Sequence, residues 1–362
     1  MKAPARWTQK SLSDYIVLQR GFDLPLRNRV SGPFKVLSSG EASGWHNEGP
    51  VKGPGFVVGR ATNIGRPTWS DEDYWPLNTV LYAKDFMGND PKFAYYWFLW
   101  TDLTAYNSGS VQPMLNRNYI ANVPILVPPI DEQRGIAATL GALDDKIESN
   151  RRAVDLAETL ADALFRQHAA KEVELSSVAE VVMGSSPPGT SYNEDGEGMP
   201  FYQGVRDFGR RYPGHRVWTA APVRVAQDDD TLVSVRAPVG ELNRAWEQCC
   251  IGRGVAAIRG QARSTVFYAL RAADAVWEPF QQEGTVFGAI NKTDLAKALV
   301  SWPSDERAET LESDLASIDA RIRSLSFETS RLIDLRGALL PELLSGRLRV
   351  PEAREAVQEV VA

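Results

Sequence analysis

The sequence contains one long heptad helix twice, and this duplication constrains the fold more than any single residue does. The two copies occupy about 129–168 and 303–344. In each copy, apolar or small residues recur at steps of three and four, which is the a/d seam of a coiled coil. Apolar seam positions of the first copy fall on apolar positions of the second at an offset of 175, beginning with Ile136 and Leu311. We therefore expect two matched helices, each following a large globular segment.

The two globular segments are also related to each other. A leucine, a glycine and a proline near the start of the first segment recur 163 positions later: Leu12, Gly21 and Pro25 become Leu175, Gly184 and Pro188. The closing stretches, GSVQPMLNR (109–117) and GTVFGAINK (284–292), match at the larger offset of 175. The second segment is therefore 12 residues longer than the first, as insertions in variable loops would produce.

Short β-branched runs bounded by turn residues predict a largely β interior in both segments. The strand runs are 55–58, 79–82, 231–235 and 255–258, and short helices are expected at 92–102 and 264–272. The aromatic stretch 93–100 could offer a platform for stacking bases, but we favour a buried helix.

Composition limits where such a chain works. No apolar run approaches the ~18 residues of a membrane span, and the opening residues are too polar for a signal peptide. The two cysteines, Cys249 and Cys250, are adjacent, so they provide neither zinc-ligand spacing nor a disulfide framework. We therefore expect a cytoplasmic protein.

The net charge of -6 is weak evidence against nucleic acid, because binding depends on local patches of charge. Residues 1–130 carry 13 basic and 10 acidic side chains, whereas the helical segments carry an acidic excess. In residues 173–303, 11 of the 13 basic side chains are arginines. The planar fork of arginine suits bidentate recognition of phosphate and guanine.

Familiar catalytic patterns do not occur in the sequence. There is no Gly-Lys pair for a Walker A loop, no GxGxxG, and no Asn-Pro-Pro-aromatic motif of amino-methyltransferases. Only three histidines are present, His46, His168 and His215. We expect no catalysis, no metal site and no cofactor.

Taken together, these features resemble the specificity subunit of type I restriction–modification systems. The resemblance rests on the closing signature followed by a heptad helix, which occurs twice, at 109–134 and 284–307. The segments MGSSPPGTSYNEDGEGMPFYQGVRDFG (183–209), SVRAPVGELNRA (234–245) and LLPELLSGRLRV (339–350) add to it. It covers essentially the whole chain.

The resemblance implies an α+β fold with a pseudo-twofold internal repeat. Two globular, β-rich α/β target recognition domains are joined by two long helices that form an antiparallel coiled coil. The expected boundaries are 1–128 for the first recognition domain, 129–172 for the first helical spacer, 173–303 for the second domain, 304–350 for the second spacer, and 351–362 for a C-terminal tail.

The resemblance also implies a non-catalytic role in DNA recognition. Each recognition domain would read one half of a bipartite target in double-stranded DNA, and the coiled coil would set the spacing. The subunit would recruit two methyltransferase (modification) subunits and, for cleavage, restriction subunits. Two alternatives stay open: a freestanding bipartite DNA-binding or regulatory protein, and a coiled-coil scaffold that does not bind nucleic acid.

Residue type and placement indicate candidate DNA contacts. Arg117 and Lys292 occupy matching positions before a short helix, beside Asn116 and Asn291. A cation next to a helix N-terminus suits a phosphate, and the alternative is an exposed charge with a helix cap.

Further candidates lie in polar, glycine-rich loops and are of the types that read base edges. They are Arg60, Asn63 and Arg66 in the first segment and Gln203, Arg206, Arg210 and Arg211 in the second. For each of them, an ordinary surface-loop role is the alternative. Arg236 is a candidate that could instead pair with Glu241, and Lys52 is a candidate phosphate contact.

Overall fold

A computed structural model describes residues 6–40, 42–106, 114–281 and 288–361. The chain divides into two compact units, each of which contains a β-rich body and part of both long helices. The first unit comprises Met1–Asn150 and Phe327–Ala362, and the second comprises Arg151–Ser326. The predicted α+β architecture, with two β-rich bodies and two long helices, is confirmed.

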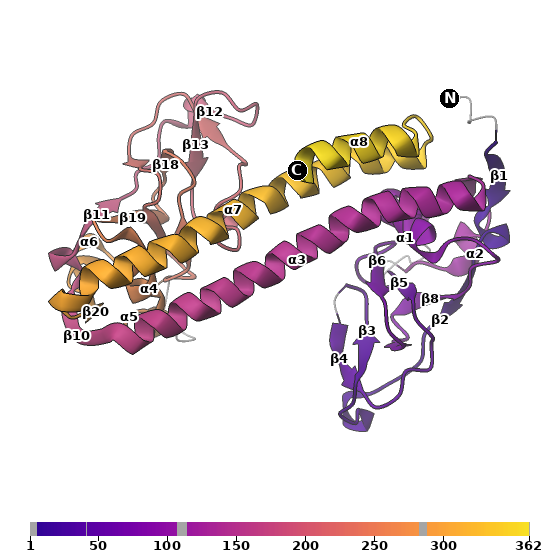
Figure 1. Ribbon diagram of the computed structural model, residues 1–362, viewed down its shortest axis with the longest axis horizontal. Coiled ribbons are helices and arrows are strands. Elements are labelled where there is room, and N and C mark those ends of the chain that lie inside the picture. The colour runs from indigo at the N-terminus through magenta and orange to yellow at the C-terminus, as the bar shows by residue number, and fades with distance from the viewer. Residues whose placement is uncertain (1–5, 41, 107–113, 282–287, 362) are drawn as a thin grey trace. The chain divides into compact units, whose positions relative to one another are not determined.

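The long helices are α3 (Ile130–His168) and α7 (Asp305–Leu344). Both begin with two acidic residues in the first turn, which interact favourably with the helix dipole. Within the first unit, the start of α3 packs against the end of α7, as Ile136 and Leu339 share one core. Within the second unit, the end of α3 packs against the start of α7, where Phe165 and Leu311 share a core. The helices therefore run antiparallel in each unit (Figure 1).

Polar residues in the helix seam are paired. Asn150 is buried and its Nδ2 donates to Glu328 Oε2 at 3.0 Å. Arg336 Nη1 donates to Asp144 Oδ1 at 2.5 Å. Such polar pairs favour one register of two helices over its alternatives.

The body of the first unit is built on an antiparallel sheet with the strand order β2-β8-β5-β6. The strands are β2 (Val17–Arg20), β8 (Val80–Asp85), β5 (Gly55–Gly59) and β6 (Pro67–Ser70). Helix α1 (Pro91–Trp100) begins at Asp90, whose side chain accepts from Phe93 N at 2.8 Å. Four of its aromatic residues, Phe93, Tyr96, Trp97 and Phe98, are buried in the core that also contains Leu140 of α3, so the prediction of a buried helix is confirmed, although Trp100 is exposed.

Smaller elements complete the first unit. A second sheet has the order β4-β3-β7, and β1 pairs with β9. Their bounds are Ala42–His46, Phe34–Leu37, Tyr74–Pro76, Thr8–Ser11 and Pro124–Val127, respectively. Helix α2 spans Arg117–Ile120. The residues expected to form a C-terminal tail instead form helix α8 (Val350–Val361), whose Ala353 is buried in the same core.

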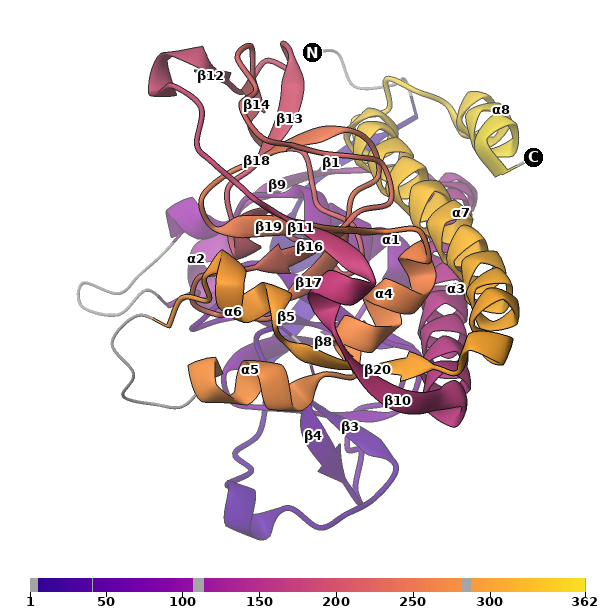
Figure 2. The same ribbon diagram turned by 90° about the vertical axis from the view of Figure 1, so that its left-hand side faces the viewer.

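The second unit repeats the main sheet in the same strand order, β11-β19-β16-β17. The strands are β11 (Ala179–Met183), β19 (Val255–Gly260), β16 (Thr231–Ser234) and β17 (Leu242–Arg244). Helix α4 (Arg263–Arg271) takes the place of α1 and lies between this sheet and the two long helices (Figure 2). Strand β10 (Ala169–Glu174) pairs with β20 (Leu299–Pro303), and α5 (Asp274–Gln281) and α6 (Lys292–Ala296) follow α4.

The extra residues of the second body lie between its first two core strands. Four strands from this stretch join β18, which follows β17, in a sheet of order β12-β14-β13-β18-β15 that takes the place of the sheet β4-β3-β7 of the first unit. Its strands are Tyr192–Asn193, Trp218–Thr219, Met199–Tyr202, Cys249–Ile251 and Val225–Ala226. The insertion predicted from the change of offset is therefore found within the body.

A repeated glycine shows how closely the two bodies correspond. Gly21 N donates to Val80 O at 3.1 Å, and Gly184 N donates to Val255 O at 2.9 Å. A Cβ at Gly21 would collide with the carbonyl oxygen of Leu77, and one at Gly184 with that of Gly252. Only glycine permits this close approach of two backbones. Within the described ranges, no helix has the length and apolar character needed to cross a bilayer.

Candidate nucleic-acid interface

A hollow of about 720 Å³ opens at one edge of the main sheet in the first unit. Strands β2 and β5 both run antiparallel to β8, so their C-terminal ends lie at this same edge. Arg20 ends β2, Arg60 follows β5, and Arg117 is the first residue of α2. The sheet topology thus brings three guanidinium groups from distant parts of the sequence to one hollow, which we call the first hollow.

The first hollow carries an excess of positive charge. Its three arginines face one carboxylate, Asp23, whose Oδ1 lies 4.0 Å from Arg20 Nη2. Arg60 Nη1 donates to the carbonyl oxygen of Asn78, at 3.4 Å. Burial, followed by the charge of Arg20, lowers the pKa of the Arg60 guanidinium. Bringing an anion into the hollow would relieve this repulsion between cations.

The second unit has a smaller hollow of about 250 Å³ at the corresponding sheet edge. Arg236 lies two residues after the end of β16, whereas Arg60 directly follows β5, and Arg253 lies in the turn before β19. Gln203, which follows β13, adds an amide to the lining of this second hollow. A cationic hollow at the end of the main sheet is therefore common to both units.

The same backbone crossing occurs directly after β5 and directly after β16. Leu115 N donates to Arg60 O at 2.8 Å, and Ile290 N donates to Val235 O at 3.1 Å. Leu115 and Ile290 are 175 positions apart, which is the offset of the closing signatures. The signature residues 109–113 and 284–287 themselves lie outside the described residues.

Both predicted asparagines cap short helices. Asn116 Oδ1 accepts from Asn118 N at 3.0 Å, and Asn291 Oδ1 accepts from Asp294 N at 2.9 Å. The cap interpretation therefore holds for Asn116 and Asn291, although Asn116 also borders the first hollow. Lys292 is exposed at the start of α6 and lies outside the described lining of the second hollow.

The other candidates of the first unit stabilise loops. Asn63 adopts a positive φ of 48° and its Nδ2 donates to Ser39 O at 3.0 Å. Arg66 N donates to Asn63 O at 3.0 Å, closing the same turn. Lys52 Nζ lies 2.6 Å from Asp73 Oδ2, and its hydrogen bond lowers the pKa of that carboxyl group. These three residues are not brought into the described lining of the first hollow.

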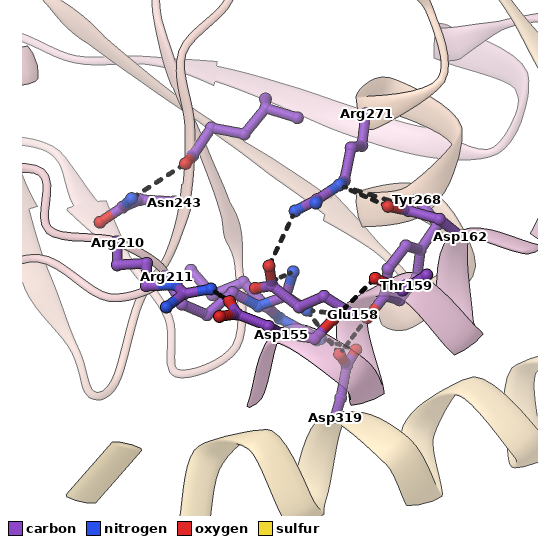
Figure 3. Close-up of polar contacts among 12 residues, drawn as sticks. Asp155, Glu158, Thr159, Asp162, Arg210, Arg211, Asn243, Tyr268, Arg271 and Asp319 are labelled. Carbon is purple, nitrogen blue, oxygen red and sulfur yellow. Dashed lines mark hydrogen bonds and ion pairs between the residues drawn. The ribbon is translucent and has the colours of Figure 1, made fainter. Parts of the chain in front are cut away.

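The loop after β13 carries most of the candidate DNA contacts of the second unit. Asp207 is buried, and its carboxylate accepts from Gln203 N at 2.6 Å and from Arg216 Nε at 2.8 Å. This holds a 3-10 turn, Val205–Asp207, on which Arg206 is exposed. Arg236 is exposed beside it, and among the described residues it forms no ion pair with Glu241. Arg210 forms an ion pair with Asp155 of α3 (Figure 3).

Arg211 corrects the sequence prediction. It was expected to contact DNA, but only 3% of it is exposed, and its Nη2 donates to Asp319 Oδ1 at 2.5 Å (Figure 3). Its guanidinium also lies 3.6 Å from the centre of the Phe267 ring. Burial lowers the pKa of this guanidinium, but the charge of Asp319, together with smaller contributions from Tyr268, Tyr212 and Glu158, more than offsets that effect, so the net shift is upward. Arg211 is therefore a buried structural cation, because an arginine in a glycine-rich loop can point inward as well as outward.

Sequence reasoning missed three residues that line the hollows: Arg20, Asn118 and Arg253. Arg20 directly precedes the repeated glycine Gly21, and Arg253 directly follows Gly252 just before the predicted strand run 255–258. That position was the available signal, since polar side chains at the ends of neighbouring strands converge. Within the described residues, no group of three or more His, Cys, Asp and Glu side chains is arranged to hold a metal ion.

Comparison with known proteins agrees with this architecture. Residues 10–155 match the family model for the type I restriction modification DNA specificity domain. A protein of Methanocaldococcus jannaschii, named type I restriction enzyme MjaX specificity subunit, is 31% identical over 266 residues. The aligned region covers 66% of this chain and 62% of that relative, so the chain spans less than two thirds of the relative's length.

A solved structure shares the fold across nearly the whole chain. The S subunit of a type I restriction-modification system from M. genitalium aligns with a TM-score of 0.68 at 17% identity. The alignment covers 95% of this chain and 98% of that chain. The matched DNA specificity domain and the curated relative show that this chain is similar to specificity subunits of type I restriction–modification systems, and the solved structure shows that it shares the fold of one such subunit.

Proposed function

We propose that this chain is the DNA sequence-specificity subunit of a type I restriction–modification complex, and that each unit reads one half of a bipartite target. The observation that carries the proposal is the repetition of a cationic hollow at the same sheet edge in both units. Arg60 directly follows β5 and Arg236 lies two residues after the end of β16, and each lines the hollow of its own unit. A repeated fold with a repeated cationic site suits a ligand that offers two anionic contacts on one molecule.

The chemistry of the hollows suits DNA. Guanidinium groups bind phosphate oxygens or the O6 and N7 acceptors of guanine through paired hydrogen bonds. Gln203 and Asn118 add amides, which can pair with adenine in the major groove. The hollows are too small for a duplex, so we infer that each one takes a phosphate or a base edge while the loops around it follow the groove. Arg66, Arg206, Arg210, Lys52 and Lys292 stay candidate contacts around these sites.

We further propose the division of labour that the family implies. Residues 1–128 and 173–303 act as recognition domains, and the helical segments 129–172 and 304–350 set the distance between half-sites. The partners are double-stranded DNA, two methyltransferase subunits and restriction subunits. The chain itself is non-catalytic and needs no cofactor, so methyl transfer, with the base flipping that it requires, belongs to the partner.

Methylation mapping tests the proposal directly. Genomic DNA is sequenced with modification detection from cells that have and lack the protein. We expect one bipartite methylation motif to disappear with the protein. Persistence of every motif in the deletion strain contradicts the proposal.

Variants of the two hollows then assign the half-sites. Arg60→Ala should alter recognition of one half-site and Arg236→Ala the other, because the two residues belong to different units. Arg354→Ala, in the exposed part of α8, is the matched control and should leave both halves unchanged. Identical effects of the first two variants on both halves would contradict reading of one half by each unit.

A further inference from the structure

We propose that Arg211 and Asp319 form a positioning clamp that ties the recognition loop of the second unit to α7. Through this clamp, base selection in one half-site depends on a residue pair that does not touch DNA. The recognition loop is defined here as residues 203–211. The inference rests on the proposed function, because it concerns how one of the two proposed recognition sites is held.

The carboxylate of the clamp is buried and accepts hydrogen bonds from three side chains. Asp319 Oδ1 accepts from Arg211 Nη2 at 2.5 Å and from Tyr268 OH at 2.9 Å. Its Oδ2 accepts from Arg244 Nη1. All of these groups belong to the second unit, and Figure 3 shows the side chains of Arg211, Tyr268 and Asp319 converging. Charge-assisted bonds from several directions fix a side chain more narrowly than apolar packing does.

Two arginines lie in the protein interior, where the loss of hydration makes a charged group energetically unfavourable. Arg211 and Arg244 are each 3% exposed, so both guanidinium groups have lost almost all contact with water. Buried ion pairs add little net stability compared with apolar side chains of similar size, and their best-attested benefit is a unique arrangement. We therefore infer that this cluster fixes the position of the recognition loop relative to α7.

The recognition loop is held at both of its ends. At its start, Gln203 lines the second hollow and its N donates to the buried carboxylate of Asp207 at 2.6 Å. Near its end, Gly209 O accepts from Asn243 Nδ2 at 2.9 Å. Arg211 O then accepts from Arg244 N at 2.9 Å while the Arg211 side chain reaches Asp319. Only seven residues lie between Gln203 at the hollow and Arg211 in the clamp, so a shift at Arg211 is transmitted to Arg206 and Gln203.

The first unit lacks this link among its described residues. There, Asp144 occupies the position equivalent to Asp319 and accepts from Tyr96 OH at 2.6 Å. Its arginine partner, however, is Arg336 of α7 itself, at 2.5 Å, and not a residue of a loop in the body. The arginine of the second unit has thus been placed on the loop that carries the candidate base contacts. The effect of breaking the clamp should therefore be confined to one half-site.

The test uses the full chain in its own host, with methylation mapping as the readout. Arg206→Ala first identifies the half-site that the second unit reads. Arg211→Met then removes the clamp charge while keeping an unbranched side chain of similar length. We expect methylated sites with a mismatch in that half-site to increase about fivefold or more, with the other half unchanged. Arg321→Met is the matched control, since Arg321 is exposed on α7 of the same unit and is not in the recognition loop; it should leave the motif intact.

A merely structural role predicts a different result. It would lower methylation evenly over all sites with an unchanged motif, and that outcome overturns the clamp. If Arg211→Met fails to accumulate, Tyr268→Phe removes a single donor to Asp319, and an unchanged motif in that variant also overturns the inference. Loss of the proposed function is distinguishable, because the wild-type strain would then show no bipartite motif that depends on this protein.

Discussion

Asp144 and Asp319 are 175 positions apart, and each accepts a hydrogen bond from a tyrosine of the short helix that packs against its own long helix. Tyr96 OH lies 2.6 Å from Asp144 Oδ2, and Tyr268 OH lies 2.9 Å from Asp319 Oδ1. Burial, followed in the first unit by the charge of Asp144, raises the pKa of Tyr96, and burial also raises the pKa of Tyr268. Both phenols therefore stay protonated and act as donors, so the internal repeat preserves a polar attachment of body to helix.

Removing either tyrosine hydroxyl should destabilise its unit. A hydrogen bond to a charged group contributes about 1.5–3 kcal/mol, so Tyr96→Phe and Tyr268→Phe should each lower the free energy of unfolding by about that amount. Urea unfolding followed by circular dichroism measures the change. Tyr119→Phe is the control, because Tyr119 is 59% exposed and should change stability by less than about 0.5 kcal/mol. Equal stability of all three variants would contradict a stabilising role for the two tyrosine–aspartate hydrogen bonds.

Deleting the carboxylate of Asp319 should have a larger effect. Asp319→Ala leaves the guanidinium groups of Arg211 and Arg244 buried without their shared partner. Breaking a buried ion pair in this way costs about 3–5 kcal/mol. The matched control is Asp314→Ala on the exposed face of the same helix, which should be nearly neutral. Thermal and urea unfolding of the full chain compare the two, and a cost for Asp319→Ala as small as that of the control contradicts the buried network.

The hollows should contribute to DNA binding through phosphate charge. If Arg60 contacts a phosphate, Arg60→Ala should reduce the slope of log affinity against log salt by about 0.9. Adding Arg236→Ala should double that reduction. Gel shifts at several salt concentrations, with the modification subunit present, measure the slope. An unchanged slope with discrimination lost at one base pair would instead assign Arg60 to a base edge.

The pair of Lys52 and Asp73 predicts a local pH response. The hydrogen bond from Lys52 lowers the pKa of Asp73 below the ordinary value of about 3.9. A lowered pKa in the folded state means that the pair stabilises the fold above the unfolded pKa and that this contribution is lost as pH falls through the folded pKa. Lys52→Met should return the pKa of Asp73 towards its ordinary value, as measured by NMR titration of the carboxyl carbon. Asp305, whose pKa is lowered by Lys171, is an internal reference that should not move.

The length of the two long helices should set the gap between the two DNA half-sites. Inserting seven residues into each of α3 and α7, near Asn150 and Phe327, keeps the seam in register and adds ~10.5 Å of helix. At ~3.4 Å per base pair, the gap between half-sites should grow by about three base pairs. Methylation mapping should show the same two half-sites at the new spacing. Altered half-site sequences would show that spacing and base reading are not separable.

Much of the fold could be predicted because the sequence has a regular heptad pattern and an internal repeat. The heptad seam gave the two long helices, and the offset of 175 related Ile136 to Leu311, both of which lie in buried cores. The short β-branched runs gave the four central strands of the sheets. Helix α8 was not predicted, because the sequence alone does not identify the surface against which residues from Val350 onward pack. In the structure, Ala353 of this helix is buried in the core of the first unit.

The candidate site was predicted less well, because residue type does not reveal which way a side chain points. Arg210 and Arg211 are neighbours of identical type, yet one is half-exposed and the other is buried on Asp319. Arg20 was missed because its partners in the first hollow, Arg60 and Arg117, are far away in sequence and meet only at the edge of a sheet.

The sequence by itself therefore determined the repeat, the long helices, the strand-rich bodies and the family resemblance, since each depends on local spacing along the chain. The tertiary structure alone decided which cations converge on the hollows and which are sequestered against α7. The physical reason is that antiparallel pairing of β2 and β5 with β8 brings together strand ends that are distant in sequence. A buried guanidinium is stable only beside a carboxylate, and for Arg211 that carboxylate is Asp319. Neither consequence is encoded within any short stretch of the chain.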